Sequence, residues 1–315
     1  MYEGFSMLNK NKLYIAMVII AGLSYGVQSI AFKIANQAGV GWNYAVFSQS
    51  FFGILFFGLA LLLHWLFFRR SFKWNKLCRK ELVKLVILGC LSTTTGICYG
   101  ISLTMLPVAF SATLLFQFTW MGVVLHAICN RKLPDKTHIV AVAIILIGTV
   151  FACDLLSLER SFKSDIYGYL FGIFAAVSYT FFIHLSGSTG RELPSLQRGF
   201  IVALASLVPA IVVCPRPLGD LEIIEPMLWC GIVAGFVALF IPVILLGIGA
   251  KHLGTAMCTI LTSSELPGAV VLAIIFLGEQ VSAAKILGIA LILMGVCVSQ
   301  LSQLKKPQQR KLESS

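Results

Sequence analysis

Long apolar segments alternate with short polar segments along the whole chain. Each apolar block runs for about 20 residues, and a helix of that length crosses about 30 Å of hydrocarbon. The blocks are continuously apolar rather than alternating residue by residue, which argues against a β-barrel. The pattern predicts an all-α integral membrane protein with ten transmembrane helices, at about 13–35, 42–68, 82–103, 107–129, 137–154, 166–187, 196–214, 226–249, 253–277 and 283–302.

The composition agrees with this class. Hydrophobic residues make up 58% of the 315 residues and charged residues only 12%, where a soluble domain carries roughly 25% charged residues. The first apolar block follows Lys10 and Lys12 and is not followed by a small-residue cleavage site. We therefore expect a retained helix there rather than a signal peptide.

The net charge of +11 invites a nucleic-acid interpretation, which the distribution of the charge does not support. If the N-terminus is cytoplasmic, most lysines and arginines fall in cytoplasmic segments, including the basic cluster at 69–84. This asymmetry follows the positive-inside rule and predicts that both termini are cytoplasmic, with 303–315 as a cytoplasmic tail. The basic cluster should also contact anionic lipid headgroups, so we expect membrane lipids and no nucleic acid as partners.

The nine cysteines form no CxxC motif, and most lie inside apolar segments. Small buried cysteines of this kind usually behave as apolar residues. The sequence therefore predicts no disulfide framework, no metal site and no cofactor.

The two halves of the chain resemble each other. Residues 265–295 align with 118–148, with identities that include Val270 with Val123 and Gly295 with Gly148, and 21–30 aligns with 175–184. We expect two five-helix repeats, at 1–154 and 166–302. An odd number of spans makes the second repeat enter from the opposite side of the membrane, and such inverted repeats are a recurrent transporter architecture with the substrate site between them.

Several motifs resemble those of one family, the drug/metabolite transporter superfamily with its EamA-type ten-helix permeases. They are K-H-L-G at 251–254, E-L-P at 265–267, L-G-E at 277–279, and a tenth helix containing Gly288 and Gly295. The resemblance implies an exporter or facilitator of amino acids or other small metabolites in the cell inner (plasma) membrane. Two departures stand out: Leu266 separates the Glu and Pro that often adjoin in the family, and the first half has residues 130–132 (Asn-Arg-Lys) in place of L-G-E.

Glu265 is the strongest candidate for a substrate-binding residue, with Ser264 beside it. It lies near the middle of the span 253–277, where a carboxylate costs at least about 2.5 kcal/mol unless it faces a cavity or a partner. It could bind a substrate ammonium group, and because burial disfavours an ionised carboxyl group it is also the candidate for proton coupling. The alternative is a neutral, hydrogen-bonded Glu that joins helices.

Other polar residues at mid-span are weaker candidates for the cavity wall. Gln117 and Trp120 share a face of the fourth span and align near Glu265, and Tyr25, Gln28, Tyr99 and Tyr179 are polar or aromatic positions in the first, third and sixth spans. Aromatic walls can stack on a cationic substrate, although tyrosine hydroxyls also serve to join helices. We expect Lys33, at the end of the first span, to extend outward, with binding of a substrate carboxylate as the alternative. Gly22 with Gly26 should allow close helix packing.

Glu279 has a different interpretation. It follows the ninth span, and with Ser282 it precedes the tenth helix, where a negative charge is favourable by about 0.3–1 kcal/mol. We expect an interfacial corner there rather than a binding site.

The function that these observations favour is a secondary transporter of a small polar metabolite, an amino acid or amine, acting by alternating access as a monomer or homodimer. A P-loop is absent, as is the HExxH motif of an intramembrane metalloprotease, and no pair of mid-membrane aspartates is present. The alternatives are an intramembrane enzyme or a non-transporting receptor, for which the short loops leave little surface.

Overall fold

The structure is a computed structural model, and it describes residues 2–67, 77–106, 108–152, 166–214, 224–277 and 282–312. The regular secondary structure of these residues is helical throughout. The interpretation of Glu279 falls on 278–281, outside the described residues, as does the end of the predicted span 137–154.

The first half contains six helices in the described residues, α1 (Tyr2–Gln37), α2 (Trp42–Phe67), α3 (Arg79–Met105), α4 (Val108–Leu115), α5 (Phe118–Asn130) and α6 (Lys136–Ala152). The second half continues with α7 (Ile166–Ser188), α8 (Ser195–Val213), α9 (Ile224–Ala234), the π-helical turn η2 (Gly235–Phe240), α10 (Ile241–Leu253), α11 (Thr255–Thr262), α12 (Glu265–Leu277) and α13 (Ala283–Leu312).

Seven helical segments of the described residues are long and apolar enough to cross a membrane, and α6 and residues 286–299 of α13 form shorter apolar helices. Large apolar side chains are exposed on these helices, among them Phe67, Val212 and Ile128. An exposed apolar surface of this kind fits contact with lipid. The predicted class, an all-helical multi-pass membrane protein, is therefore confirmed, while the count of ten crossings stays a prediction.

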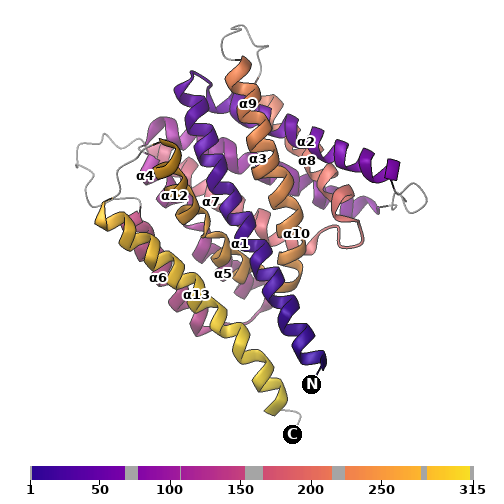
Figure 1. Cartoon of the computed structure of the whole chain (residues 1–315), viewed down its shortest axis with the longest axis vertical. Helices are drawn as coiled ribbons and strands as arrows, with labels where there is room; N and C mark the ends of the chain where they lie inside the picture. The colour runs from indigo at the N-terminus through magenta and orange to yellow at the C-terminus, as the bar shows by residue number, and fades with distance from the viewer. Residues whose placement is uncertain are drawn as a thin grey trace.

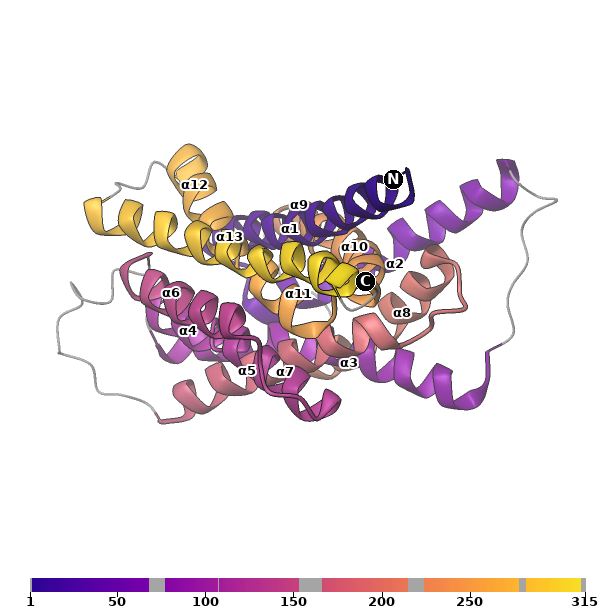
Figure 2. The ribbon, with the colours of Figure 1, turned by 90° about the horizontal axis from the view of Figure 1, so that it is seen from below.

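Helices of the two halves pack against each other throughout the bundle. α3 contacts α7 and α8, α1 contacts α10 and α12, and α2 contacts α8 and α9. α6 and α13 lie side by side along one edge in both views, while α2 and α8 pack together away from them (Figure 1, Figure 2). The core is therefore shared between the halves, with Phe57, Phe118 and Phe182 among its largest buried side chains.

The predicted span 253–277 is not one helix, because it breaks between α11 and α12 at Ser263 and Ser264. Pro267 has no N–H to donate to the Ser263 carbonyl, and its ring would clash with that carbonyl in a regular helix. The Ser263 carbonyl instead accepts a hydrogen bond from the Leu266 N–H at 3.3 Å. The break therefore follows from the proline, and it makes Glu265 the first residue of α12.

The predicted span 107–129 also breaks, between α4 and α5 at Phe116 and Gln117. No proline lies in this break. The Gln117 N–H bonds to the Leu114 carbonyl at 3.2 Å, and the Gln117 side-chain Nε2 donates to the Thr113 carbonyl at 2.9 Å. The side chain thus bonds the carbonyl that the Gln117 N–H would reach in a regular helix.

The predicted span 226–249 is interrupted by η2 and runs on to Leu253. The Ile241 N–H bonds to the Phe236 carbonyl five residues earlier, and Pro242 follows with no N–H to donate. The K-H-L-G motif forms the end of α10. Its Gly254 has a φ of 78°, a left-handed conformation that favours glycine, and it makes the turn to α11.

Helix bounds repeat between the halves in the register of the sequence alignment. The helices α4, α5 and α6 begin at residues 108, 118 and 136, and α11, α12 and α13 begin at 255, 265 and 283. Each start in the second half thus follows its counterpart by one constant offset, and the two breaks fall at equivalent positions.

Candidate substrate cavity

A cavity of about 640 Å³ lies among helices of both halves. Its wall is built by residues of α1, α2, α3, α4, α7, η2 and α12. This volume is within the range of small-molecule sites, about 300–1,000 Å³. The position between the halves is where a transporter of repeated architecture binds its substrate.

Glu265 is half-buried, and among the described residues that line the cavity it is the only one with a carboxyl group. The break before α12 places this carboxyl group at a helix N-terminus. The positive end of the helix dipole favours a negative charge there. The local fold thus offsets part of the cost of placing a carboxylate among apolar helices.

Two glycines of α1 bring α12 close enough for Glu265 to reach the cavity. A Cβ atom at Gly26 would lie 2.7 Å from the Ala269 backbone nitrogen and 3.0 Å from the Glu265 carbonyl oxygen, and one at Gly22 would lie 2.5 Å from the Ser264 hydroxyl. Only small residues permit this approach. The spacing of Gly22 and Gly26 therefore serves close packing of α1 on the α11–α12 break.

An aromatic cluster lies beside Glu265 at the same end of the cavity. The Tyr25 and Tyr179 rings meet edge to face with centroids 5.7 Å apart, and Tyr179 also packs on Phe118 at 4.7 Å and stacks with Phe182 at 6.1 Å. The Tyr179 hydroxyl is buried, and it has no hydrogen-bond partner in the part of the chain that the structure describes. A buried hydroxyl of this kind usually has a partner, so water or a ligand can be expected there.

The remaining wall is richer in amides and hydroxyls. Gln28 of α1 donates through Nε2 to Gln49 Oε1 of α2 at 2.9 Å, and Tyr99 of α3 lines the same cavity. Tyr25, Gln28 and Asn36 lie toward one side of α1, because their spacings of three and eight residues are close to one and two helical turns. The cavity therefore has hydrogen-bonding groups along its length.

Three residues proposed for the cavity from the sequence do not line it. Trp120 is exposed and donates through Nε1 to Gln117 Oε1 at 2.8 Å, on the outside of the α4–α5 break. Ser264 is buried and lies 3.2 Å from the Ile19 carbonyl, to which its hydroxyl donates. The structure therefore does not bring Gln117 and Trp120 into this cavity, and their role in binding stays a prediction.

Other lining residues were missed by the sequence analysis. They are the polar or aromatic residues Asn36, Gln37, Trp42, Gln49, Thr93 and Thr95. Lys33, expected to extend outward, is exposed and also lines the cavity. The helical spacing from Tyr25 through Gln28 to Asn36 could have indicated that Asn36 lies on the cavity side of α1. Gln49 carried a comparable signal, because it lies between Ser48 and Ser50 inside the apolar run of α2, whereas Trp42 begins α2 and carried none.

Two groups that can carry opposite charges share the cavity. Glu265 packs beside Gly26, and Lys33 lies two helical turns further along α1, a rise of roughly 10 Å. The arrangement can hold an ammonium group at one end and an anionic or polar group at the other.

Comparison with known proteins agrees with this architecture. Residues 166–300 match the model of the EamA-like transporter family, which confirms the family resemblance predicted from the motifs. The family match and the fold indicate that the protein is a membrane transporter of small molecules.

Twenty-nine chains of solved structures match this chain. One of them, a crystal structure of a protein described without an activity, has 18% sequence identity and a TM-score of 0.70, and the match covers 91% of this chain and 98% of that chain. At this identity the likeness concerns the fold alone. A search of curated proteins found no significant match.

Proposed function

We propose that the protein is a secondary transporter that moves a small amino acid or amine across the cell inner membrane by alternating access. The observation that carries this proposal is the cavity between the halves with Glu265 at one end. A carboxylate in such a cavity pairs well with a substrate ammonium group, since charge-assisted hydrogen bonds are roughly twice as strong as neutral ones.

The one-sided shape of the cavity supports alternating access. Its wall runs from Glu265 to Gly41 and Trp42, at the turn between α1 and α2. Beyond Glu265 in the other direction, every residue of α11 is buried. With cytoplasmic termini, as the charge distribution predicts, the α1–α2 turn lies on the outer side and the buried α11 lies between Glu265 and the cytoplasm, as expected of an outward-facing state.

The repeated helix bounds support the same mechanism. Equivalent breaks in α4–α5 and α11–α12 fit two five-helix repeats of inverted orientation that can exchange their conformations. In that exchange, the inner side would open as the outer side closes.

The charges of the cavity favour an amino acid over a simple amine. Tyr25, Tyr179 and Glu265 suit an ammonium group, because aromatic faces and a carboxylate both attract cations. Lys33 suits a carboxylate and repels a second cation. Glu265 is also the candidate for proton coupling, since it can carry either a proton or the substrate ammonium group.

Uptake by proteoliposomes tests the proposal. Labelled amino acids and amines are screened with and without a pH gradient, and the best substrate is then measured with Glu265→Gln. The matched control is Glu225→Gln, because Glu225 is exposed at the start of α9 and does not line the cavity. We expect Glu265→Gln to lose both flux and pH dependence and Glu225→Gln to keep them. Equal flux in the two variants would reject the role of Glu265.

A further inference from the structure

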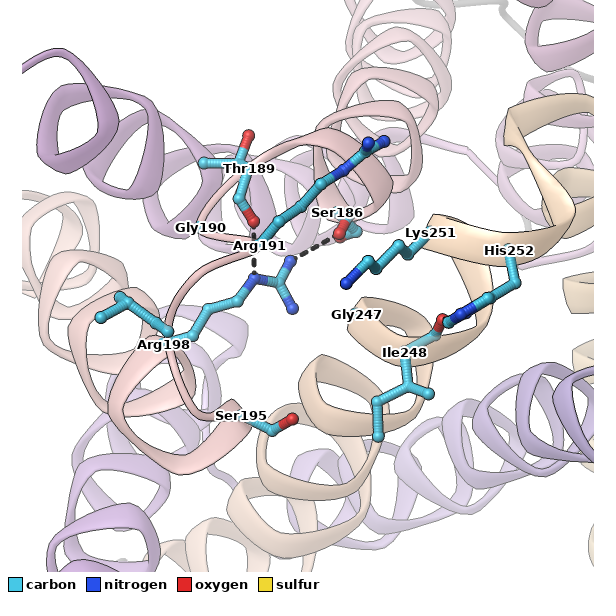
Figure 3. A pocket seen from close by; sticks show the side chains of 11 residues that line it. Ser186, Thr189, Gly190, Arg191, Ser195, Arg198, Gly247, Ile248, Lys251 and His252 are labelled. Carbon is cyan, nitrogen blue, oxygen red and sulfur yellow. Dashed lines mark hydrogen bonds between the residues drawn. The ribbon is translucent and has the colours of Figure 1, made fainter. Parts of the chain in front are cut away.

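A second, smaller pocket of about 160 Å³ lies between α7, α8 and α10. It shares no lining residue with the substrate cavity. Its wall includes three permanently cationic side chains, those of Arg191, Arg198 and Lys251, together with His252 (Figure 3). The described residues that line it include no aspartate or glutamate.

Arg198 is the buried cation of this pocket, with 5% of its surface exposed. Its Nε donates to the Thr189 carbonyl at 3.1 Å, Nη2 to the Ser186 carbonyl at 2.7 Å and Nη1 to the Val243 carbonyl at 3.4 Å. A guanidinium group has five N–H donors, so these bonds leave donors unused. The bonds fix the orientation of Arg198 without supplying a negative charge.

Gly247 of α10 is needed for this placement of the guanidinium group. A Cβ atom at that position would collide with Arg198 Nη1. The guanidinium group therefore lies directly against the backbone of α10, one helical turn before Lys251.

Lys251 completes the positive wall. Figure 3 shows its ammonium group directed toward the guanidinium group of Arg198 across the pocket. Two like charges that face each other repel, more strongly near a protein interior than in water. The His252 ring closes the wall, since it stacks on Tyr14 with centroids 3.9 Å apart and its Nδ1 lies 2.8 Å from the Ile248 carbonyl.

Two carboxylates lie near the loop between α7 and α8 without lining the pocket. Glu192 belongs to this loop and is exposed, and Glu81 contacts the loop from α3. Glu81 of α3 accepts a hydrogen bond from the Gly190 N–H at 3.0 Å and forms an ion pair with Lys84 at 2.7 Å. Its charge is therefore held at the loop backbone and by another cation. The pocket between Arg198 and Lys251 keeps a positive charge that a bound anion would neutralise.

We propose that this pocket binds a phosphate-class oxyanion, held between Arg198 and Lys251. The planar fork of arginine matches phosphate oxygens, and lysine adds a point charge. A volume of about 160 Å³ admits several waters or one small oxyanion. With the predicted topology the site faces the cytoplasm, and the oxyanion is either free phosphate or the phosphodiester of an anionic lipid headgroup.

Such an anion would link three helices, because Arg198 belongs to α8 and Lys251 to α10, while Ser186 at the end of α7 is bonded to Arg198. The site does not depend on the proposed transport activity. The competing interpretation is that Arg198 only caps the carbonyl end of α7. The two interpretations differ in what they expect of Lys251, which forms none of the capping bonds.

The thermal unfolding of the purified full-length protein in detergent tests the proposal. Its melting temperature is measured in sodium phosphate and in sodium chloride of equal ionic strength, and again in vesicles of phosphatidylglycerol and of phosphatidylcholine. The informative variant is Lys251→Gln, because Lys251 is exposed and its loss should not unfold the chain. The matched control is Lys132→Gln, an exposed lysine on the same predicted side of the membrane.

We expect phosphate or phosphatidylglycerol to raise the melting temperature of the wild-type protein and of Lys132→Gln. Lys251→Gln should weaken the apparent affinity by about tenfold or more, as the loss of one charged hydrogen bond predicts. A rise with inorganic phosphate identifies a free oxyanion, and a rise confined to phosphatidylglycerol identifies a lipid headgroup. If neither raises the melting temperature beyond its neutral control, or if Lys251→Gln responds like Lys132→Gln, the proposal is wrong.

Discussion

The two helix breaks, between α4 and α5 and between α11 and α12, occupy equivalent positions in the two halves but carry different chemistry. The first begins α5 with Phe118, which is fully buried against Tyr179, and has Trp120 exposed on its outer side. The second begins α12 with Glu265, which lines the cavity, and has Pro267 in the place of Trp120.

The comparison shows that backbone geometry can repeat while the chemistry at the repeated position changes. Gln117 maintains the first break with a side-chain bond to the Thr113 carbonyl, and Pro267 maintains the second by removing a donor. The first break is part of the packing of the bundle, and the second is part of the cavity wall. Four expected outcomes, from the largest to the smallest, test this contrast.

The largest effect should come from Phe118→Ala. Removal of a buried phenyl ring from a soluble core costs about 3–5 kcal/mol, and the value here should lie at or below that range because lipid is as apolar as the core. Trp120→Ala should lower the melting temperature much less, since Trp120 is exposed. Thermal unfolding in detergent measures both, and equal losses would contradict the packing assigned to the first break.

Pro267→Ala should straighten the α11–α12 break, because alanine supplies the missing N–H and favours a helix. Glu265 would then shift, and we expect transport to fall on the order of 10- to 100-fold with no loss of melting temperature. Pro209→Ala is the control, since Pro209 lies inside α8 and does not line the cavity. If the two variants transport equally well, the proline does not position Glu265.

Tyr179→Phe removes a buried hydroxyl that has no partner in the described residues. If this hydroxyl binds the substrate, its loss should weaken substrate affinity by about fivefold, the worth of one neutral hydrogen bond. The melting temperature should stay constant or rise. Competition uptake measures the affinity, and an unchanged affinity with an unchanged melting temperature would exclude a contact with the substrate.

The smallest effect is expected for Gln117→Leu. It breaks the bonds to Thr113 and Trp120 and should cost about 1 kcal/mol of stability with unchanged transport. Gln28→Leu is the matched comparison, because Gln28 lines the cavity and its loss should reduce transport. If Gln117→Leu is expressed normally but transports poorly, the first break contributes to the transport site, which would contradict the packing role assigned to it.

Much of the fold could be predicted from the sequence, because lipid leaves a spanning chain few alternatives to long apolar helices. Tyr25, Gln28, Tyr99, Tyr179 and Glu265 stood out as polar or aromatic positions inside apolar runs, and all five line the cavity. Their roles in binding remain proposals.

The rest depended on local geometry. Gln117 and Trp120 were placed by analogy with the second half. The spacing of residues along the sequence does not determine which way each side chain faces where a helix breaks. Lys33 is exposed, as a lysine at a helix end usually is, and it also lines the cavity because the cavity reaches as far as its position. The π-helical turn before Pro242 could not be predicted from the sequence, because it forms where η2 packs against α2.

The central claim is that Glu265 recognises the ammonium group of the substrate, and analogues of the transported amino acid test it most directly. Wild-type uptake should discriminate against the analogue that lacks the amino group by at least about tenfold, as the loss of one charged hydrogen bond predicts. Because Glu265→Gln is expected to lose flux, the variants are compared by equilibrium binding of the two analogues. Glu265→Gln should lose the discrimination, and Glu225→Gln should keep it. If Glu265→Gln still rejects the deaminated analogue as strongly as the wild-type protein does, another residue reads the ammonium group and the account of this cavity is wrong.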